Sequence, residues 1–312
     1  RFMNKRNIIL DCDPGHDDAI AIMLAGKSDL INLLGITVVG GNQTLEKTGR
    51  NTLNLCQYLD IDVPVCLGSA NPLVKILEVC PQIHGESGLD GFDFPDLTID
   101  YHNQNGINFI VETILKSKEK VTVVTTGPMT NLALAIRLEP KIMDNIDEVL
   151  LMGGSYTNGN VTPAAEFNIY SDPEAAFIVF NSGLPVKMFG LDVTRKVMVY
   201  ESVIERMEKL NNKASLLFSK LMKVFNENQY RTFGLEAGPL HDPLPIAYLL
   251  DESVVELSWV HCDIDISRGD SYGRTNCDIF DYMKLPKNTF VATKVDVNKY
   301  WDIIEQGIKN YN

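Results

Sequence analysis

The fold of this 312-residue chain is decided by the stretch Ile8-Ile9-Leu10-Asp11-Cys12-Asp13-Pro14-Gly15-His16-Asp17-Asp18 and by the apolar run that follows it. Residues 8–10 are short, apolar and mostly β-branched, which is typical of a buried strand. Residues 19–25 are a longer run with Ala, Leu and Met, which favours a helix. The sequence therefore predicts a strand, a loop and a helix, with four aspartates crowded into the loop.

These four aspartates present a charge problem. Carboxylates packed into eight residues repel one another unless positive charge lies among them. The N-terminus of the helix supplies part of that charge, and a divalent cation would supply far more. Ligands that offer only oxygen suit Mg²⁺ or Ca²⁺ better than zinc. In the alternative interpretation Asp17 or Asp18 caps the helix while Asp11 and Asp13 are solvated, but two caps leave two acids unexplained.

Other metal-binding motifs fit the loop less well. The DxD loop of haloacid-dehalogenase-like phosphotransferases also follows a first strand and binds Mg²⁺, but here Pro14-Gly15 follows the pair and Asp17-Asp18 is extra. An EF-hand would need helices on both sides and a bidentate Glu at its own position. Cys12, which lies between two acids at the end of a strand, is expected in the core rather than on zinc.

Short apolar strands alternate with helical stretches along the rest of the chain. Further strands are expected at 33–39, 63–67, 121–125, 148–152 and 186–190. Helices are expected at 45–59, 105–116, 131–136 after a Thr130 cap, from Asp172-Pro173 onward, at 201–230, at 242–250 and around Trp301. This alternation predicts an α/β fold, an open, mostly parallel, Rossmann-like sheet with helices on both faces. The irregular stretch 71–101 is expected to be functional or mobile, and no linker divides the chain, so we expect one domain over 1–312.

Small or polar residues follow the expected strands. In open α/β sheets the ligand lies at the carboxyl ends of the strands, so these residues are expected to face one pocket. They are Asp11 and Asp13, Asn42, Thr126-Gly127, Gly153-Gly154 and Asp192.

Two histidines lie in contexts that suggest chemistry. His241 precedes Asp242-Pro243, where Asp242 fits both a helix N-cap and a metal ligand, and histidine is suited to proton transfer near neutral pH. His84 lies among glycines in the irregular stretch, which would allow a flap over a site, although a single loop histidine is more often simply solvated.

The composition excludes several classes of partner. The net charge is -13, with 28 basic against 41 acidic residues and no Lys/Arg block, so a nucleic acid is not expected. No apolar stretch is long enough to span a bilayer, and the N-terminus lacks a signal-peptide pattern, so a cytoplasmic location is expected. We interpret Met3 as the natural start. The six cysteines lack metal-site or disulfide spacing and are expected to be reduced thiols.

Several further motifs accompany the aspartate loop in a characteristic order. They are Gly41-Asn42-Gln43-Thr44, His84-Gly85-Glu86-Ser87-Gly88, Thr126-Gly127-Pro128, Leu151-Met152-Gly153-Gly154, Ala165-Glu166-Phe167-Asn168 and His241-Asp242-Pro243. Together with the aspartate loop, this set resembles the inosine–uridine-type nucleoside hydrolases from end to end. The combination is specific, whereas any single motif would not be.

The resemblance implies hydrolysis of the N-glycosidic bond of a ribonucleoside to ribose and free base, with one Ca²⁺ per subunit. The metal ligands would be the carboxylates of Asp13, Asp18 and Asp242 and the main-chain carbonyl of Thr126. Asp13 would also be the general base, His241 or His84 would be the acid for the leaving base, and Asp11 would support the others. The sugar would be held by Asp17, Asn42, Asn160, Glu166 and Asn168, and the base would be contacted by Gln229 and Phe233.

Gln229 and the segment Gly88-Leu89-Asp90-Gly91 resemble the pyrimidine-preferring branch, so uridine and cytidine are the expected substrates, with inosine as the alternative. That branch often has Tyr where Phe233 stands, and the more helical part, about 200–250, would border the base pocket. A homotetramer, or else a dimer, is implied. Two other classes stay open: a non-catalytic nucleoside or ribose binder, and a Mg²⁺ phosphotransferase, for which no phosphate-binding Lys motif is present.

Overall fold

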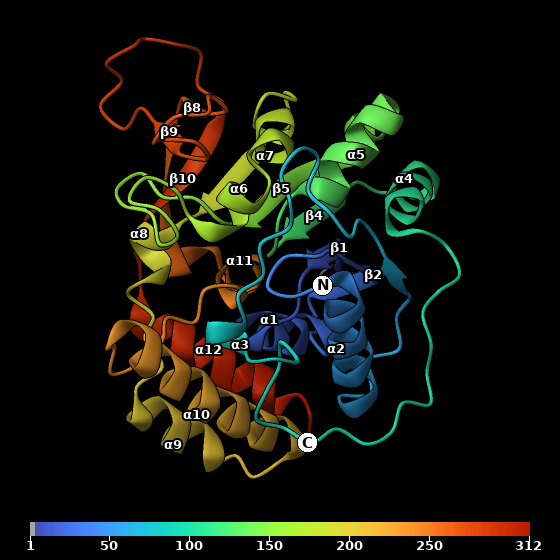
Figure 1. The fold of residues 1–312 in the computed structure, drawn as a ribbon. Helices are drawn as coiled ribbons and strands as arrows, with labels where there is room; N and C mark the ends of the chain where they lie inside the picture. The colour runs from blue at the N-terminus through green and yellow to red at the C-terminus, as the bar shows by residue number, and fades with distance from the viewer. Residues whose placement is uncertain (1–3) are drawn as a thin grey trace.

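The computed structural model describes residues 4–312, so the interpretation of Met3 falls outside the described residues. An eight-stranded sheet with the order β3-β2-β1-β4-β5-β6-β10-β7 forms its centre (Figure 1). Its strands are β1 (Arg6–Cys12), β2 (Ile31–Val38), β3 (Val65–Leu67), β4 (Val121–Thr125), β5 (Ile146–Met152), β6 (Val186–Phe189), β7 (Val255–Val260) and β10 (Thr289–Val295). Every neighbouring pair is parallel except β10 with β7. The predicted open, mostly parallel sheet is confirmed, and its first six strands have the Rossmann order.

Helices cover both faces of this sheet, as predicted. They are α1 (His16–Gly26), α2 (Leu45–Tyr58), α3 (Pro81–His84), α4 (Gly106–Lys116), α5 (Thr130–Leu138), α6 (Phe167–Ser171), α7 (Pro173–Phe180), α8 (Leu191–Thr194), α9 (Glu201–Glu208), α10 (Lys213–Phe233), α11 (Pro243–Leu250) and α12 (Val297–Lys309). Short 3₁₀ helices span Pro140–Asn145 and Glu252–Val254, and a separate antiparallel pair joins β8 (Cys262–Ile264) to β9 (Thr275–Cys277). In Figure 1, α1, α2 and α9 to α12 lie on one side of the sheet, and α4, α5 and α7 lie on the other.

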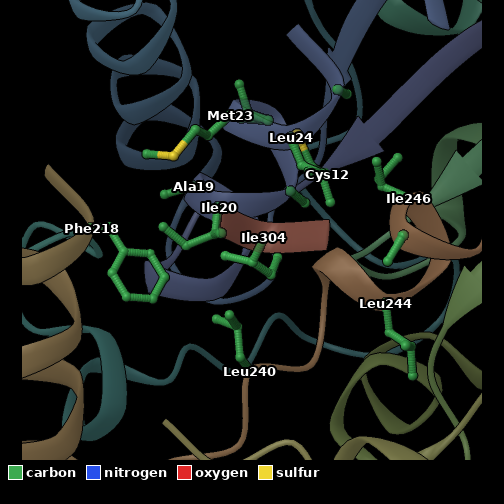
Figure 2. Close-up of a cluster of buried hydrophobic side chains, with 14 of the residues drawn as sticks. Cys12, Ala19, Ile20, Met23, Leu24, Phe218, Leu240, Leu244, Ile246 and Ile304 are labelled. Atoms are coloured by element: carbon green, nitrogen blue, oxygen red, sulfur yellow. The ribbon is translucent and has the colours of Figure 1, made fainter. Parts of the chain in front are cut away.

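Strand β1 shows why the sheet needs two helical layers. Ile8 and Leu10 belong to the buried cluster under α1, α10 and α12, whereas Ile9 belongs to the cluster under α4, α5 and α7. Side chains alternate between the faces of a strand, so an all-apolar strand must be covered on both sides. Figure 2 shows the first cluster, where Ile20 of α1 lies among Phe218 and Ile304.

The structure corrects several sequence-based expectations. Thr130 does not cap α5; it lies inside the helix, and its hydroxyl donates to Oδ2 of Asp172 at 2.6 Å. The helix expected over 201–230 is broken into α9 and α10, with Asn211 between them at a φ of 52°. Asp242 stands at the N-cap position of α11, but its side chain makes no capping hydrogen bond. The stretch 71–101 is irregular as expected, apart from α3.

The six cysteines are free thiols, as predicted, and Cys12 is fully buried. Sγ of Cys262 lies 2.8 Å from Sγ of Cys277, across β8 and β9. Among the helices of residues 4–312, none combines the length and the apolar character that crossing a bilayer requires.

Candidate functional site

A cavity of about 780 Å³ lies at the carboxyl ends of the strands. Most of the side chains singled out in the sequence line it, although they come from segments spread over more than 220 residues. These are Asp17, Asn42, His84, Thr126, Asn160, Glu166, Asn168, Gln229, Phe233, His241 and Asp242. Asp13 and Asp18 do not line the cavity; both are completely buried in the aspartate loop.

Of the strand-end residues expected to face the pocket, Asn42 and Thr126 line the cavity, whereas Asp11, Asp13, Gly127, Gly153, Gly154 and Asp192 do not. Asp192 has another role. Its carboxylate accepts from the main-chain N–H of Tyr156 at 2.9 Å and from the hydroxyl of Thr157 at 2.5 Å. It is not among the residues that line the cavity. The expectation that Asp192 faces the pocket is therefore wrong, because it stabilises the neighbouring loop instead.

Three carboxylates gather at one side of the cavity, where Asp17 and Asp242 line it and Asp18 is buried beside them. One oxygen from each of Asp17, Asp18 and Asp242 lies within 4.8 Å of the others. Asp18 is held in place because its Oδ2 accepts from the hydroxyl of Thr126 at 2.8 Å and its Oδ1 accepts from the main-chain N–H of Gly15 at 3.2 Å. Asp18 therefore accepts a hydrogen bond at the N-terminus of α1, as the capping interpretation requires. Capping explains only this one of the four aspartates.

Asp13 lies beside this group in a tight space. Its Oδ2 accepts from the main-chain N–H of Asn42 at 2.8 Å, whereas its Oδ1 is buried and has no hydrogen-bond partner among residues 4–312. A Cβ atom at Gly41 would lie 2.2 Å from Oδ2, and one at Gly127 would lie 2.6 Å from Oδ1. Both glycines therefore leave room for a carboxylate that a larger residue would displace.

Burial dominates the electrostatics of these acids. It raises the pKa values of Asp13 and Asp242 well above their usual range, and the charges of neighbouring aspartates raise them further. Burial and the charge of Asp18 raise the pKa of Asp17 to about 7. Buried aspartates this close together can all be ionised only when a cation lies among them. The orphaned oxygen of Asp13 and the oxygen-only donors fit a hard divalent cation such as Mg²⁺ or Ca²⁺.

A second wall of the cavity carries neutral and acidic hydrogen-bonding groups. Glu166 caps α6, and its carboxylate accepts from the main-chain N–H groups of Gly154 at 2.9 Å and Asn168 at 2.8 Å. The Asn168 amide donates to the carbonyls of Thr126 at 2.9 Å and Met152 at 3.0 Å, so its own oxygen stays available. Burial raises the pKa of Glu166 to about 7.

Two further residues complete the polar lining. Oδ1 of Asn160 accepts from the main-chain N–H of Phe167 at 2.9 Å, which leaves its amide N–H groups available. The Asn42 amide donates to the carbonyl of Asp13 at 2.9 Å and to Oδ1 of Asp18 at 3.2 Å. The cavity thus offers both hydrogen-bond donors and acceptors, which suits a ligand rich in hydroxyl groups.

Both predicted histidines line the cavity; His84 is buried and His241 is half-buried. Nδ1 of His241 lies 2.6 Å from the hydroxyl of Thr194. Burial lowers the pKa of His241 to about 3, and the nearby Arg195 guanidinium adds to this effect. Burial also lowers the pKa of His84 well below its usual range, with smaller effects from His16 and His241. Both imidazoles are therefore neutral at pH 7.

Sequence reasoning did not single out several residues in or beside this site, among them His16, Arg195 and Phe225. Phe225 had a detectable signal, because Phe225, Gln229 and Phe233 follow one another at four-residue spacing on one face of α10, and all three line the cavity. Arg195 lines the cavity and donates to the carbonyls of Asn158 and Gly159, a contact that no local pattern indicates.

Comparison with known proteins agrees with this geometry. The profile of a family described as inosine-uridine preferring nucleoside hydrolase matches residues 8–302. The pyrimidine-specific ribonucleoside hydrolase RihB of Escherichia coli O1:K1 is 45% identical over 309 residues, which cover 99% of each protein. The solved structure of the purine-preferring ribonucleoside hydrolase from Gardnerella vaginalis has a TM-score of 0.90 at 33% identity, covering 97% of this chain and 99% of that one. The plant nucleoside hydrolase PpNRh1 also has a TM-score of 0.90, at 27% identity, with 98% and 99% coverage.

The profile match and the sequence identity both extend over nearly the whole chain. The fold agrees over the same length. The chain therefore belongs to the family of inosine-uridine preferring nucleoside hydrolases, enzymes that hydrolyse the N-glycosidic bond of nucleosides.

Proposed function

We propose that this protein hydrolyses ribonucleosides to ribose and free base in a Ca²⁺-dependent reaction, with uridine and cytidine as its preferred substrates. The observation that carries the proposal is the grouping of Asp17, Asp18 and Asp242 beside the unpartnered buried oxygen of Asp13, next to a large cavity that Asp17 and Asp242 line. This grouping calls for a cation, and the cavity above it has room for a nucleoside.

In this proposal, Asp13, Asp18, Asp242 and the carbonyl of Thr126 hold the calcium ion. Ca²⁺ takes six to eight oxygen ligands, so positions remain for water and for the 2′- and 3′-hydroxyls of ribose. When bound, the ion would orient the ribose diol and lower the pKa of the attacking water. Asp17 is assigned to the sugar because it is the most exposed of the three grouped acids, at 6%.

Asp13 is proposed as the general base. The N–H of Asn42 holds Oδ2 of its carboxylate in place, so the side chain is fixed while the carboxylate takes a proton from the attacking water. As the glycosidic bond breaks, positive charge develops on the ribose ring, as in glycoside hydrolysis generally. The carboxylates of Asp17 and Glu166 and the amide oxygen of Asn168 would stabilise that charge.

The base is proposed to bind against α10. Phe225 and Phe233 offer apolar surface there, and between them Gln229 is buried with a side-chain amide that has no hydrogen-bond partner in the described part of the chain. An amide offers both a donor and an acceptor, which a uracil or cytosine edge would satisfy. The pyrimidine-specific name of the E. coli relative supports this preference.

We also propose that the chain is one nucleoside-hydrolase domain over 1–312 that acts in the cytoplasm as a homo-oligomer, a tetramer or else a dimer. The profile match over residues 8–302 supports the single domain. Sedimentation of the purified protein tests the assembly, and a mass of one chain would contradict it.

Incubation with uridine, cytidine and inosine, followed by measurement of reducing sugar and chromatography of the free base, tests the activity and the base preference together. We expect kcat/KM to be highest for the two pyrimidine nucleosides. Ribose from inosine alone would contradict the preference, and ribose from none of the three would contradict the activity.

A further inference from the structure

Two of the six cysteines face each other directly. Cys262 of β8 lies opposite Cys277 of β9 in the antiparallel register, although the two are 15 positions apart along the chain. Their Sγ atoms are 2.8 Å apart. The two strands form a small sheet of their own, separate from the central one (Figure 1). The fold therefore brings together two thiols whose spacing in the sequence gave no sign of a pair.

The hydrogen bonds around Cys262 show which kind of cross-strand pair this is. Its main-chain N–H and carbonyl both bond to the side-chain amide of Asn288, each at 2.8 Å, and so point away from β9. The next pair along is the bonded one, since the N–H of Asp278 donates to the carbonyl of His261 at 2.8 Å. Cys262 and Cys277 thus form a non-hydrogen-bonded pair, in which Cα atoms lie about 4.5 Å apart. Disulfides span Cα separations of about 4.4–6.8 Å, so this spacing suits one.

Contacts with the rest of the protein hold the two strands in this register. Tyr272, in the loop between the strands, donates to Oε1 of Glu174 at 2.5 Å. The Thr275 hydroxyl of β9 accepts from the main-chain N–H of Ser155 at 2.9 Å and donates to its carbonyl at 2.6 Å. Since Asn288 holds β8 and Ser155 holds β9, the thiols face each other before any bond forms between them. Such prior alignment favours a reaction between two groups.

The two thiols differ in their access to solvent. Cys262 is completely buried, whereas Cys277 is half-buried. Burial also raises the pKa of the Cys262 thiol well above its usual range, and the neighbouring Cys277 adds to this effect. A cysteine reacts as its thiolate and only where a reagent can reach it. Cys277 is therefore the thiol that meets an oxidant first, and Cys262 is the one that reacts second.

We propose that Cys262 and Cys277 form a reversible disulfide when the protein meets a small-molecule disulfide such as oxidised glutathione. The Cys277 thiolate attacks one sulfur of the oxidant, and the other sulfur leaves as a thiolate. The Cys262 thiol then loses its proton, and its sulfur attacks Sγ of Cys277 and displaces the second thiolate. The two cysteines give up two electrons and two protons, which convert the oxidant to two thiols.

The disulfide would close the loop 263–276 and fasten β8 to β9. A cross-link of this kind removes conformations from the unfolded chain and so stabilises the folded state. The stabilised part lies behind one wall of the cavity, because Thr275 bonds to Ser155 and the preceding Gly154 donates its N–H to Glu166. In a reducing compartment we expect the bond to form only under oxidising conditions and to be lost when reductant returns.

Peptide mapping tests the bond itself. Reduced protein is incubated with oxidised glutathione, its remaining free thiols are alkylated, and it is digested with trypsin without reductant. Arg268 and Arg274 lie between the two cysteines, so trypsin places them on separate peptides. We expect these two peptides to be joined, and dithiothreitol to separate them. A digest of the oxidised protein in which they are not joined would overturn the proposal.

Cys80 is the internal control of the same digest. It is half-buried like Cys277, but no other thiol faces it in the described part of the chain. Its peptide should be alkylated or carry glutathione, and it should not be joined to another peptide. Joining of Cys80 to other cysteines at the same yield would show random cross-linking and would also overturn the proposal.

Two single variants test the order of the reaction. In Cys262→Ala, Cys277 should stop at the mixed disulfide with glutathione, because no second thiol displaces it. In Cys277→Ala, Cys262 should stay unmodified, because the oxidant does not reach a buried thiol. Equal modification of the single remaining cysteine in the two variants would overturn the assignment of Cys277 as the attacking thiol. The wild-type digest keeps the disulfide testable if either variant fails to fold.

Thermal melts test the consequence for stability. We expect oxidation to raise the Tm of the wild-type protein by about 3 to 8 °C and to leave that of Cys262→Ala unchanged. Joined peptides without a rise in Tm would overturn the fastening of β8 to β9. These measurements need no turnover, so their outcome is independent of the proposed hydrolase activity.

Discussion

The main-chain N–H of Asn42 donates to Oδ2 of Asp13 at 2.8 Å, while Oδ1 of the same carboxylate is buried without a partner in the described residues. An Asp13→Asn side chain can still accept from Asn42 but has no charge with which to take a proton. We expect the variant to fold and its kcat on uridine to fall about 10²- to 10⁴-fold. Asp147→Asn, at an exposed position of β5, is the matched control and should keep full activity. Full turnover by Asp13→Asn would exclude Asp13 as the base.

Calcium should stabilise the folded protein against heat. The buried group of Asp17, Asp18 and Asp242 is repulsive without a cation, and a ligand that binds only the folded state raises its stability with increasing concentration. In a thermal melt of chelator-treated protein, we expect Tm to rise as Ca²⁺ is added. Asp242→Asn should lose most of that rise, whereas Asp147→Asn should retain it. A Tm that does not respond to Ca²⁺ in the wild-type protein would contradict the metal assignment.

The stability of the protein should depend on pH through Asp11. Burial raises the pKa of this carboxyl from 3.8 to about 7, against the smaller opposite effects of hydrogen bonds from Thr37 and Asn131. The folded state therefore binds the proton more tightly than the unfolded state, and stability falls as pH rises from 3.8 to about 7. The loss is on the order of 4 kcal/mol, since each pKa unit corresponds to roughly 1.4 kcal/mol.

Asp11→Asn removes the ionisable group, so the free energy of unfolding should decline less over this interval than in the wild-type protein. Urea unfolding at a series of pH values measures the difference. Asp147→Asn, whose side chain is exposed, should keep the wild-type dependence. Identical pH profiles for Asp11→Asn and the wild-type protein would show that Asp11 does not titrate in this range.

The sugar itself offers a test of the proposed diol contacts. If Asp17 and the cation hold both ribose hydroxyls, a substrate that lacks the 2′-hydroxyl leaves buried polar groups unsatisfied. Sites of this kind reject such analogues by about 10⁴- to 10⁵-fold in kcat/KM. We expect 2′-deoxyuridine to be hydrolysed at least about 10³-fold less efficiently than uridine. Comparable rates for the two nucleosides would rule out a metal-bound diol.

The sequence predicted best those features that depend on neighbours along the chain. The strand, the aspartate loop and α1 follow from residues 8–25, and the Asp172 cap of α7 from its Pro173. The Thr130 prediction failed because Asp172, 42 residues away, accepts the hydrogen bond of the hydroxyl. The contact between His16 and His84 spans 68 residues, and it depends on the absence of a side chain at Gly15. The order of the motifs identified most of the residues that line the cavity. Which of their hydrogen-bond donors and acceptors remain free depends on contacts that form only in the folded chain.

Ribose release from uridine before and after removal of metal is the most direct test of the proposed Ca²⁺-dependent hydrolysis. The enzyme is treated with a chelator that binds Ca²⁺ in preference to Mg²⁺, and then Ca²⁺ or Mg²⁺ is added back separately. We predict ribose formation by the untreated enzyme, loss of activity after chelation, and recovery with Ca²⁺. Unchanged ribose release by the fully chelated enzyme would contradict the dependence on Ca²⁺. No ribose under any condition would contradict the hydrolase activity itself.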